Sequence, residues 1–219
     1  KILAEYAKNY EFANRVAVDG DGKRLVLSDA KGPIFTEDDI LYTLASRNKM
    51  IGKEQSDPVI GTTISNQGVL EALGNLGISF LRTDVGDKYI SRELVKRDLN
   101  VGAEPSGHII QREFSESGDA NIALIQTLAA LQELDTTIEE IKKNINYKPL
   151  SLRNFSVADK KVIESQIFIE SIEKLQKNYP DARISVRKSG TEPIIRAMVE
   201  AETENDKDSI LNEIESLIS

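Results

Sequence analysis

The chain has 219 residues, 40% of them hydrophobic and 29% charged, which is ordinary for one large globular domain or two to three small ones. Its net charge of −8 argues against general binding to nucleic acid or a membrane surface, although a few local cations could still hold a phosphorylated small molecule. No cysteine is present, so disulfides and thiolate chemistry are excluded. No signal peptide or apolar run of ~20 residues is visible, so a cytoplasmic location is expected.

The pattern of apolar residues and turn formers predicts an α/β protein in three parts. The first part, 1–55, begins with a helix end at 2–10 and contains two short strands, 15–18 and 25–28, around a tight turn. A second turn at 29–32 leads to a helix over 37–49, which Thr36 caps. The polar stretch before Pro58 marks the first expected boundary.

The second part, 56–146, alternates strands with helices, which predicts an α/β domain with a mixed sheet. Its expected strands are 59–64, 79–83 and 101–103, and its expected helices are 68–76, 88–96, 119–134 and 137–144. The third part, 147–219, reads as a small α+β domain in the order β-α-β-β-α. Its expected elements are a strand at 150–155, a helix at 158–177, strands at 183–187 and 194–201, and a helix at 206–218.

Three loops at the ends of predicted strands carry the chemistry, and the first is Asp-Gly-Asp-Gly-Lys-Arg at 19–24. Asp19 and Asp21 can converge on one hard cation because the glycines let the backbone turn tightly. An EF-hand is excluded, since Lys23 and Arg24 occupy a ligand position and the obligatory glycine position of that motif. A solvated acidic hairpin turn remains the simpler alternative.

The second loop, 102–108, offers an acceptor, a hydroxyl and the only imidazole of the chain, from Glu104, Ser106 and His108. These groups can hydrogen-bond vicinal sugar hydroxyls, and His108 is available for proton or phosphate contacts. Taken alone, a polar turn with a surface histidine is the commoner explanation.

The third loop is 187–193, and Arg196 lies just beyond it. Together they are predicted to form a compact cradle for an anion. Arginine binds phosphate bidentately, and loop amides add further donors. An ordinary charged hairpin is the less favoured alternative, because Arg187, Lys188 and Arg196 together carry +3, before the charge of Glu192 is counted, in a chain of −8. The candidate phosphate-binding residues are Arg187, Lys188, Ser189, Gly190, Thr191 and Arg196.

In this order, the motifs Asp-Gly-Asp-Gly-x-Arg, Glu-x-Ser-Gly-His and Arg-x-Ser-Gly-Thr-Glu-Pro resemble the α-D-phosphohexomutase superfamily. The segments 59–66, 83–89 and 117–120 are most similar to the bacterial phosphoglucosamine mutases within it. The resemblance covers essentially the whole chain. It implies a protein of four domains, of which this chain holds the C-terminal half of the metal-loop domain (1–55), the sugar-binding domain (56–146) and the phosphate-binding domain (147–219).

The resemblance also implies roles for the candidate residues. Asp19 and Asp21 would be magnesium ligands, and Arg24 would reach the reacting phosphate, with His108 near the reaction centre. Glu104 and Ser106 would hold sugar hydroxyls. The third loop and the arginine beyond it, 187–191 with Arg196, would grip the phosphate that is not reacting.

Two departures from the family pattern matter. Family members carry a phosphoserine nucleophile in a Ser-His-Asn-Pro-like loop that does not occur here, and Ser65 belongs to a different motif. Lys23 stands where the family has a third metal-ligand aspartate. We therefore expect magnesium to be the family's cofactor but not to bind this chain alone, and the Lys23 ammonium to lie near Asp19 or Asp21.

The implied reaction interconverts glucosamine 6-phosphate and glucosamine 1-phosphate through a bisphosphate intermediate and an enzyme phosphoserine outside this chain, in the synthesis of peptidoglycan precursors. The parent protein would be an intramolecular phosphotransferase, and this chain alone would be inactive. The alternatives are a phosphomannomutase or phosphoglucomutase, and a non-catalytic phosphosugar-binding fragment or paralogue. The expected partners are a phosphosugar and the missing N-terminal domains, and a homodimer is left open.

Overall fold

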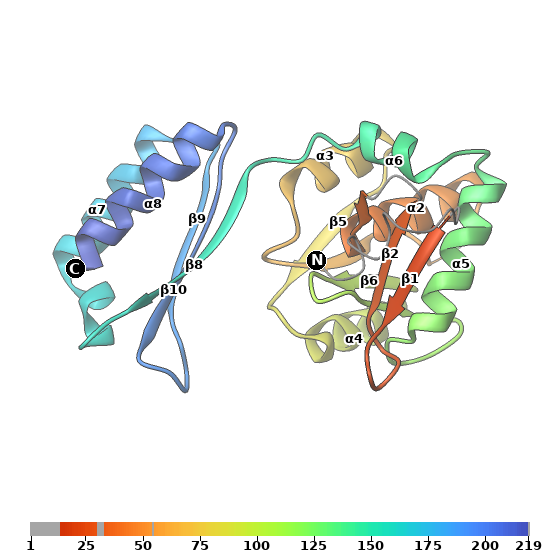
Figure 1. Ribbon diagram of the computed structural model, residues 1–219, viewed down its shortest axis with the longest axis horizontal. Coiled ribbons are helices and arrows are strands. Elements are labelled where there is room, and N and C mark those ends of the chain that lie inside the picture. The colour runs from red at the N-terminus through yellow and green to blue at the C-terminus, as the bar shows by residue number, and fades with distance from the viewer. Residues whose placement is uncertain (1–13, 30–32, 54, 219) are drawn as a thin grey trace. The chain divides into compact units, whose positions relative to one another are not determined.

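The computed structural model describes residues 14–29, 33–53 and 55–218. The helix end expected at 2–10 and most of the turn expected at 29–32 lie outside these residues. The chain divides into two compact units, Lys1–Asn146 and Tyr147–Ser219 (Figure 1). The first and second expected parts both lie in the first unit, and their division near residue 55 stays a prediction.

The first unit opens with a small antiparallel sheet of three strands, in the order β1-β2-β3. They are β1 (Asn14–Val18), β2 (Leu25–Asp29) and β3 (Ile34–Phe35). Helix α2 (Glu37–Met50) follows, and its start is fixed by a capping box in which the Thr36 hydroxyl and the Asp39 carboxylate bond each other's backbone N–H. The cap predicted from the sequence at Thr36 is therefore confirmed.

A second sheet, of four strands, holds the centre of the first unit. Its strands run in the order β5-β4-β6-β7, with β4 parallel to β5 and β6, and β7 antiparallel to β6. Their bounds are β4 Val59–Thr62, β5 Phe80–Thr83, β6 Val101–Glu104 and β7 His108–Gln111. The predicted mixed α/β sheet is thus confirmed, although β7 was not predicted.

Helices surround this sheet and bury its apolar side chains. They are α3 (Gln67–Asn75), α4 (Asp87–Lys96), α5 (Ala120–Glu133) and α6 (Ile138–Asn144). Helix α4 packs on β4, β5 and β6, where Ile60, Ile90, Leu94, Leu99 and Ile110 form one buried cluster. Helix α2 packs against α5 and β6, which brings the N-terminus of α2 close to the strand that carries Glu104.

The second unit is a three-stranded antiparallel sheet covered by helices, in the order β8-β10-β9. Its strands are β8 (Leu150–Ser156), β9 (Arg183–Lys188) and β10 (Ile194–Glu200), and its α-helices are α7 (Gln166–Asn178) and α8 (Glu204–Ile218). Alternate residues of β10 enter the core, together with Leu175 of α7 and Ile210 of α8. The small α+β domain predicted from the sequence is confirmed.

One predicted helix is wrong in detail. The helix expected at 158–177 is interrupted, because a 3₁₀ helix, η1 (Lys160–Glu164), precedes α7. Ser165 separates the two, and its hydroxyl accepts the N–H of Phe168 at 3.2 Å as the N-cap of α7. Among the described residues, no helix combines the length and the apolar character needed to cross a membrane.

Candidate functional site

The turn Asp19–Arg24, hereafter the acidic turn, joins β1 to β2 and is closed by its own first carboxylate. Oδ1 of Asp19 accepts the backbone N–H groups of Lys23 at 2.9 Å and of Arg24 at 3.0 Å. Gly22 has a φ of 74°, a conformation that glycine adopts readily. The Arg24 N–H above all, then the Lys23 N–H, Asp21 and the Arg24 charge, hold the pKa of Asp19 below its ordinary value.

Cations of the acidic turn lie against both of its carboxylates. The Lys23 ammonium is 3.6 Å from Oδ2 of Asp21, and Nε of Arg24 is 3.7 Å from Oδ2 of Asp19. The expectation that Lys23 lies beside one of the two aspartates is therefore confirmed. The turn balances its own charge before any ligand arrives.

This donor set does not complete a magnesium site. In the part of the chain that the structure describes, no group of three or more His, Cys, Asp or Glu side chains is placed to share a metal ion. Asp19 already accepts two N–H groups, and Lys23 stands beside Asp21 where a further oxygen ligand would be needed.

The turn that carries Glu104, Ser106 and His108 connects β6 to β7 and lies against β2. Gly107 has a φ of 86°, and its carbonyl accepts the Leu25 N–H at 3.0 Å. A Cβ on Gly107 would lie 2.8 Å from the Leu25 carbonyl oxygen, so a larger residue does not fit. An antiparallel bridge also joins Arg24 to His108. Two of the loops predicted to carry chemistry are therefore neighbours.

Within this second turn, Glu104 and His108 are close together and buried, whereas Ser106 is exposed. Glu104 and His108 pair across the β6–β7 hairpin, and they are 8% and 5% exposed. The Ser106 hydroxyl donates a hydrogen bond to Oε1 of Glu104. A carboxylate held in this way keeps lone pairs with which it could accept sugar hydroxyls.

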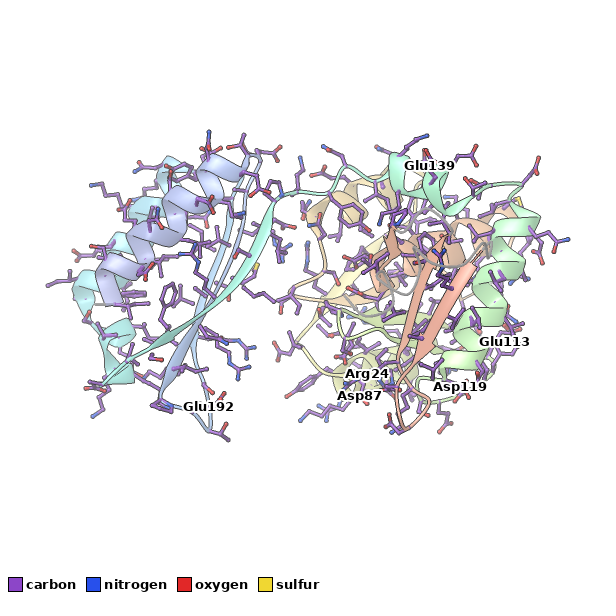
Figure 2. The ribbon with its side chains drawn as sticks, viewed as in Figure 1. Arg24, Asp87, Glu113, Asp119, Glu139 and Glu192 are labelled. Atoms are coloured by element: carbon purple, nitrogen blue, oxygen red, sulfur yellow. The ribbon has the colours of Figure 1, made fainter. Side chains whose placement is uncertain are left out.

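The segment before α5 touches both turns of the first unit. The Gly118 N–H donates to Nε2 of His108 at 3.0 Å, and the Ala120 N–H donates to the Gly22 carbonyl at 2.9 Å. Asp87, at the start of α4, places a carboxylate oxygen 4.0 Å from the same Nε2. Arg24, Asp87 and Asp119 are labelled at this end of the first unit in Figure 2.

Glu37 is a site residue that the sequence analysis missed. It is the first residue of α2, and burial raises its pKa to about 8, with further contributions from the charges of Asp38, Asp39 and Glu104. From the sequence, three acids in the first turn of a helix indicate favourable capping. Only the packing of α2 on β6 reveals that one of them lies close to Glu104.

In the second unit, the hairpin from Arg187 to Arg196, hereafter the basic hairpin, joins β9 to β10. Arg187 and Arg196 pair directly across the two strands, so their side chains lie on the same face of the sheet. Val186 and Ala197, the adjacent pair, face the core, so the arginines lie on the opposite face. Both are exposed, and the Arg187 side chain makes no ion pair or hydrogen bond within the described residues.

The other residues of the basic hairpin are largely engaged with one another. The Ser189 hydroxyl accepts the Glu192 N–H at 3.3 Å, and Glu192 accepts a hydrogen bond from Arg196 at 2.8 Å. Lys188 pairs with Glu164 of η1 at 2.5 Å, so its charge is already partly neutralised. Gly190 and Thr191 are exposed at the tip.

Lys160 was also missed by the sequence analysis. Its ammonium donates to the Ser189 carbonyl at 2.8 Å and to the Glu192 carbonyl at 3.2 Å, and so it anchors the tip of the basic hairpin. The predicted continuous helix hid this contact. The signal that could have revealed the break is Ser165, a good N-cap residue inside the expected helix.

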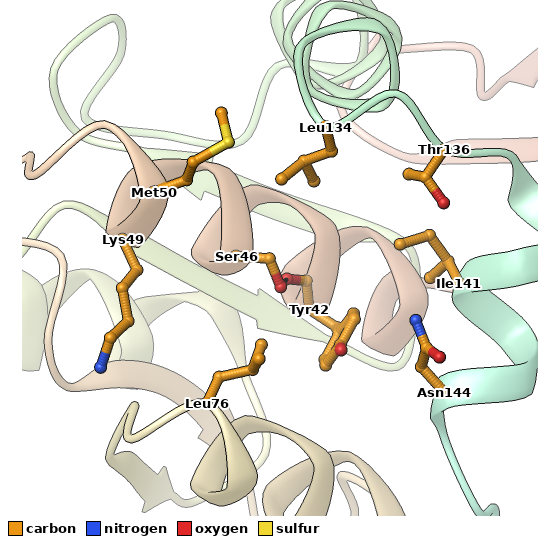
Figure 3. A pocket seen from close by; sticks show the side chains of 9 residues that line it. All are labelled: Tyr42, Ser46, Lys49, Met50, Leu76, Leu134, Thr136, Ile141 and Asn144. Carbon is orange, nitrogen blue, oxygen red and sulfur yellow. Dashed lines mark hydrogen bonds between the residues drawn. The ribbon is translucent and has the colours of Figure 1, made fainter.

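A separate pocket of about 450 Å³ lies between α2 and α6 (Figure 3). None of the residues that line it belongs to the acidic turn or to the Glu104–His108 turn. They are Tyr42, Ser46, Lys49, Met50, Leu76, Leu134, Thr136, Ile141 and Asn144.

Family models match both units of the chain. Residues 36–147 match the phosphoglucomutase/phosphomannomutase α/β/α domain III, and residues 128–217 match the C-terminal domain of the same family. The chain belongs to the phosphoglucomutase/phosphomannomutase family. The resemblance inferred from the sequence motifs is confirmed.

Relatives within this family include bacterial phosphoglucosamine mutases. The protein of that name from Hahella chejuensis is 39% identical over 205 residues, which are 93% of this chain and 46% of the relative. The one from Bacillus subtilis is 35% identical over 220 residues, which are 100% of this chain and 49% of the relative. The chain thus spans about half the length of the curated relatives it matches.

Solved structures of phosphohexomutases share the fold. An N-acetylglucosamine-phosphate mutase in its product complex matches with a TM-score of 0.78 at 19% identity, over 99% of this chain and 52% of that chain. The N-acetylphosphoglucosamine mutase of Aspergillus fumigatus, in complex with GlcNAc-6P and magnesium, matches with a TM-score of 0.76 at 19% identity, over 98% of this chain and 56% of that chain. At such identities the likeness shows the fold alone.

Proposed function

We propose that the chain is the sugar- and phosphate-binding part of a phosphoglucosamine mutase, which interconverts glucosamine 6-phosphate and glucosamine 1-phosphate. The reaction runs through a bisphosphate intermediate and a phosphoserine that this chain does not contain. This proposal is supported by family membership and by the bacterial phosphoglucosamine mutases among its relatives. The cytoplasmic location, the peptidoglycan pathway and a homodimer remain predictions.

The observation that carries the proposal is the pair of arginines in the basic hairpin. Two guanidiniums directly opposite on neighbouring strands repel each other, and Arg187 has no carboxylate partner within the described residues. Arg196 is already paired with Glu192, so a phosphate would chiefly neutralise Arg187, and it could accept bidentate hydrogen bonds from the arginines. Ser189, Gly190 and Thr191 form the turn between them, and its backbone could add further donors.

The first unit supplies groups of the kind that a sugar needs. Glu104 and Ser106 are hydrogen-bonded to each other and could hold sugar hydroxyls, and Arg24 and His108 are bridged beside them for contacts to the reacting phosphate. A mutase must hold one phosphate while the other end of the sugar reacts, which requires an anion clamp separate from the centre of phosphoryl transfer. The two units offer one set of residues for each task.

A second candidate function is phosphosugar binding without catalysis. The observation that favours it is the ion pair between Lys23 and Asp21, which puts a cation where the family places a third acidic metal ligand. A phosphomannomutase or phosphoglucomutase differs from the main proposal only in its sugar.

A titration of the ¹⁵N-labelled chain with glucosamine 6-phosphate, followed by NMR, tests the proposal. Glucosamine 6-phosphate should shift the amide signals of the Glu104–His108 turn and of the basic hairpin, each read within its own unit, and glucose 6-phosphate and mannose 6-phosphate should shift them less. No shift in the basic hairpin, or equal shifts with all three sugars, would contradict the assignment. When a sugar bisphosphate activator and magnesium are added, no glucosamine 1-phosphate should form, because this chain does not contain the phosphoserine. Conversion that depends on a residue of this chain would refute that explanation.

A further inference from the structure

The segment 117–120 was singled out by its sequence, yet none of the proposed roles uses it. In the structure it carries the N-cap of α5, where Oδ1 of Asp119 accepts the N–H groups of Asn121 at 2.9 Å and Ile122 at 3.0 Å. The residues on either side of Asp119 make the two contacts that leave the helix, from Gly118 to His108 and from Ala120 to Gly22. Capping alone needs only the aspartate, so the flanking contacts require their own explanation.

The contact from Gly118 determines which nitrogen of His108 carries a proton. Nε2 lies 3.0 Å from the Gly118 amide nitrogen, which is always a donor, so Nε2 must present a lone pair. A histidinium would instead direct an N–H from Nε2 towards Asp87, whose oxygen is 4.0 Å away and beyond hydrogen-bonding range. The contact with Gly118 is the shorter of the two, so Nε2 accepts a hydrogen bond rather than donating one. A neutral imidazole that accepts at Nε2 carries its proton on Nδ1.

Only glycine fits at position 118. A Cβ built there would lie 2.1 Å from both Cδ2 and Nε2 of His108, far inside van der Waals contact. The imidazole is 5% exposed and is held in strand β7, so it cannot move away without disturbing the hairpin. The absent side chain is therefore what allows the peptide N–H to reach the ring.

The same segment also fixes the acidic turn. The hydrogen bond from the Ala120 N–H to the Gly22 carbonyl ties α5 to the turn that carries Asp19, Asp21 and Lys23. The Leu25 N–H donates in turn to the Gly107 carbonyl, next to His108. The three segments thus form a closed set of hydrogen bonds around His108, two of them between backbone groups and one from the Gly118 N–H to the imidazole.

We propose that Gly118 is a positioning residue that fixes His108 as the neutral tautomer protonated at Nδ1, and that the segment 118–120 couples this tautomer to the placement of the acidic turn. Nδ1 has no hydrogen-bond partner within the described residues, so its N–H is available to a ligand oxygen. His108 then acts on a phosphosugar as a hydrogen-bond donor through Nδ1 and not as a proton acceptor at Nε2. This last step rests on the proposed function, whereas the tautomer does not.

The tautomer can be measured without any ligand, because His108 is the only histidine in the chain. A long-range ¹H–¹⁵N spectrum of the imidazole at neutral pH should show the proton on Nδ1 and an unprotonated, hydrogen-bonded Nε2. A spectrum with the proton on Nε2, or with a rapidly exchanging mixture, would overturn the proposal. Asp87→Asn should leave the spectrum unchanged, and a change of tautomer in that variant would show that Asp87 and not Gly118 governs the ring.

Gly118→Ala tests the coupling, with Gly74→Ala in α3 as the matched control, because a Cβ at Gly74 meets nothing within 4 Å. Gly118→Ala should shift the imidazole signals towards the Nε2-protonated form and also shift the amide signals of 20–24, while Gly74→Ala leaves both in place. An unchanged spectrum in Gly118→Ala would refute the proposal. If Gly118→Ala does not fold, the tautomer measured in the unaltered chain and in Asp87→Asn still tests the proposal.

Glucosamine 6-phosphate separates this proposal from the proposed function. The unaltered chain should show a shift of the Nδ1–H signal on titration, with the tautomer retained. If the ligand binds nowhere, the proposed function fails while the tautomer assignment stands. If it binds but moves the proton to Nε2, the donor role of His108 is wrong.

Discussion

The acidic turn of the first unit and the basic hairpin of the second are both tight connections between antiparallel strands, and both carry several charges. In the acidic turn, each carboxylate has a cation within 4 Å, and Asp19 also accepts two backbone N–H groups. In the basic hairpin, Arg196 is paired with Glu192 and Lys188 with Glu164, but Arg187 faces Arg196 with no partner within the described residues.

This difference indicates which turn needs a ligand. A turn that neutralises itself gains little Coulomb energy from an added ion, because the ion must displace contacts that already exist. Two opposed guanidiniums are stabilised by any anion that lies between them. On electrostatic grounds, the basic hairpin gains more from an added anion than the acidic turn gains from an added cation.

The largest expected effect concerns Glu37 of the first unit, whose carboxyl is surrounded by other acids rather than by cations. Its pKa in the folded chain is about 8, against an ordinary value of 4.5. Between these values the folded state binds a proton that the unfolded state releases, so stability falls as pH rises through this window. The full difference corresponds to at most about 5 kcal/mol. Glu37→Gln should remove this loss and be markedly more stable than the unaltered chain at pH 9, but not at pH 4.

Chemical denaturation across this pH range measures the effect. Glu116→Gln, an exposed glutamate in the same unit, is the matched control and should follow the unaltered chain at every pH. If Glu37→Gln shows the same fall in stability between pH 5 and 8 as the unaltered chain, Glu37 does not hold a raised pKa.

The next effect tests whether the acidic turn is self-neutralised because of Lys23. Lys23→Asp changes the summed charge of positions 19, 21 and 23 from −1 to −3 and adds an oxygen ligand. A unit charge at ~4 Å is worth roughly 1 kcal/mol even in water, so magnesium or manganese should bind at least about tenfold more tightly. Lys143→Asp, on α6, is the control for the change in net charge. Tight stoichiometric binding by the unaltered chain would show that Lys23 does not block the site.

The smallest effect concerns the stability of the basic hairpin. Arg187→Ala removes a repulsive cross-strand pair, so the second unit should become more stable by about 0.2–1 kcal/mol at low salt. The gain should shrink at high salt, because screening already weakens the repulsion in the unaltered chain. Denaturation at two salt concentrations provides the measurement. A salt-independent loss of stability would mean that Arg187 is a structural residue.

Much of the fold could be predicted because it depends on local signals. Thr36 caps α2 through neighbouring residues, and the strand–helix alternation at 59–103 predicted a mixed sheet, in which the structure pairs β4 in parallel with β5 and β6. The strand β7 was missed because it follows directly on the turn that carries Ser106 and Gly107. The 3₁₀ helix was missed because the apolar pattern continues through Ser165.

The candidate site was predictable as a set of loops but not as an arrangement. Motif order identified the residues of all three loops, and the charge argument placed Lys23 beside an aspartate. The contact of Gly118 with His108 joins β7 to the segment before α5, and the raised pKa of Glu37 reflects the approach of α2 to β6, so no pattern within a single helix or strand encodes either. Such contacts follow only from how α5 and α2 pack.

Calorimetric titration of the chain with glucosamine 6-phosphate tests the central claim, that the basic hairpin is the phosphate clamp. Arg187→Ala should lose about 1.5–3 kcal/mol of binding free energy, or roughly 10- to 150-fold in affinity, the range for a charge-assisted hydrogen bond. Arg153→Ala, which removes an arginine paired with Glu215 elsewhere in the same unit, should bind like the unaltered chain. Equal affinity of the unaltered chain and Arg187→Ala, or an equal loss in both variants, would contradict the account.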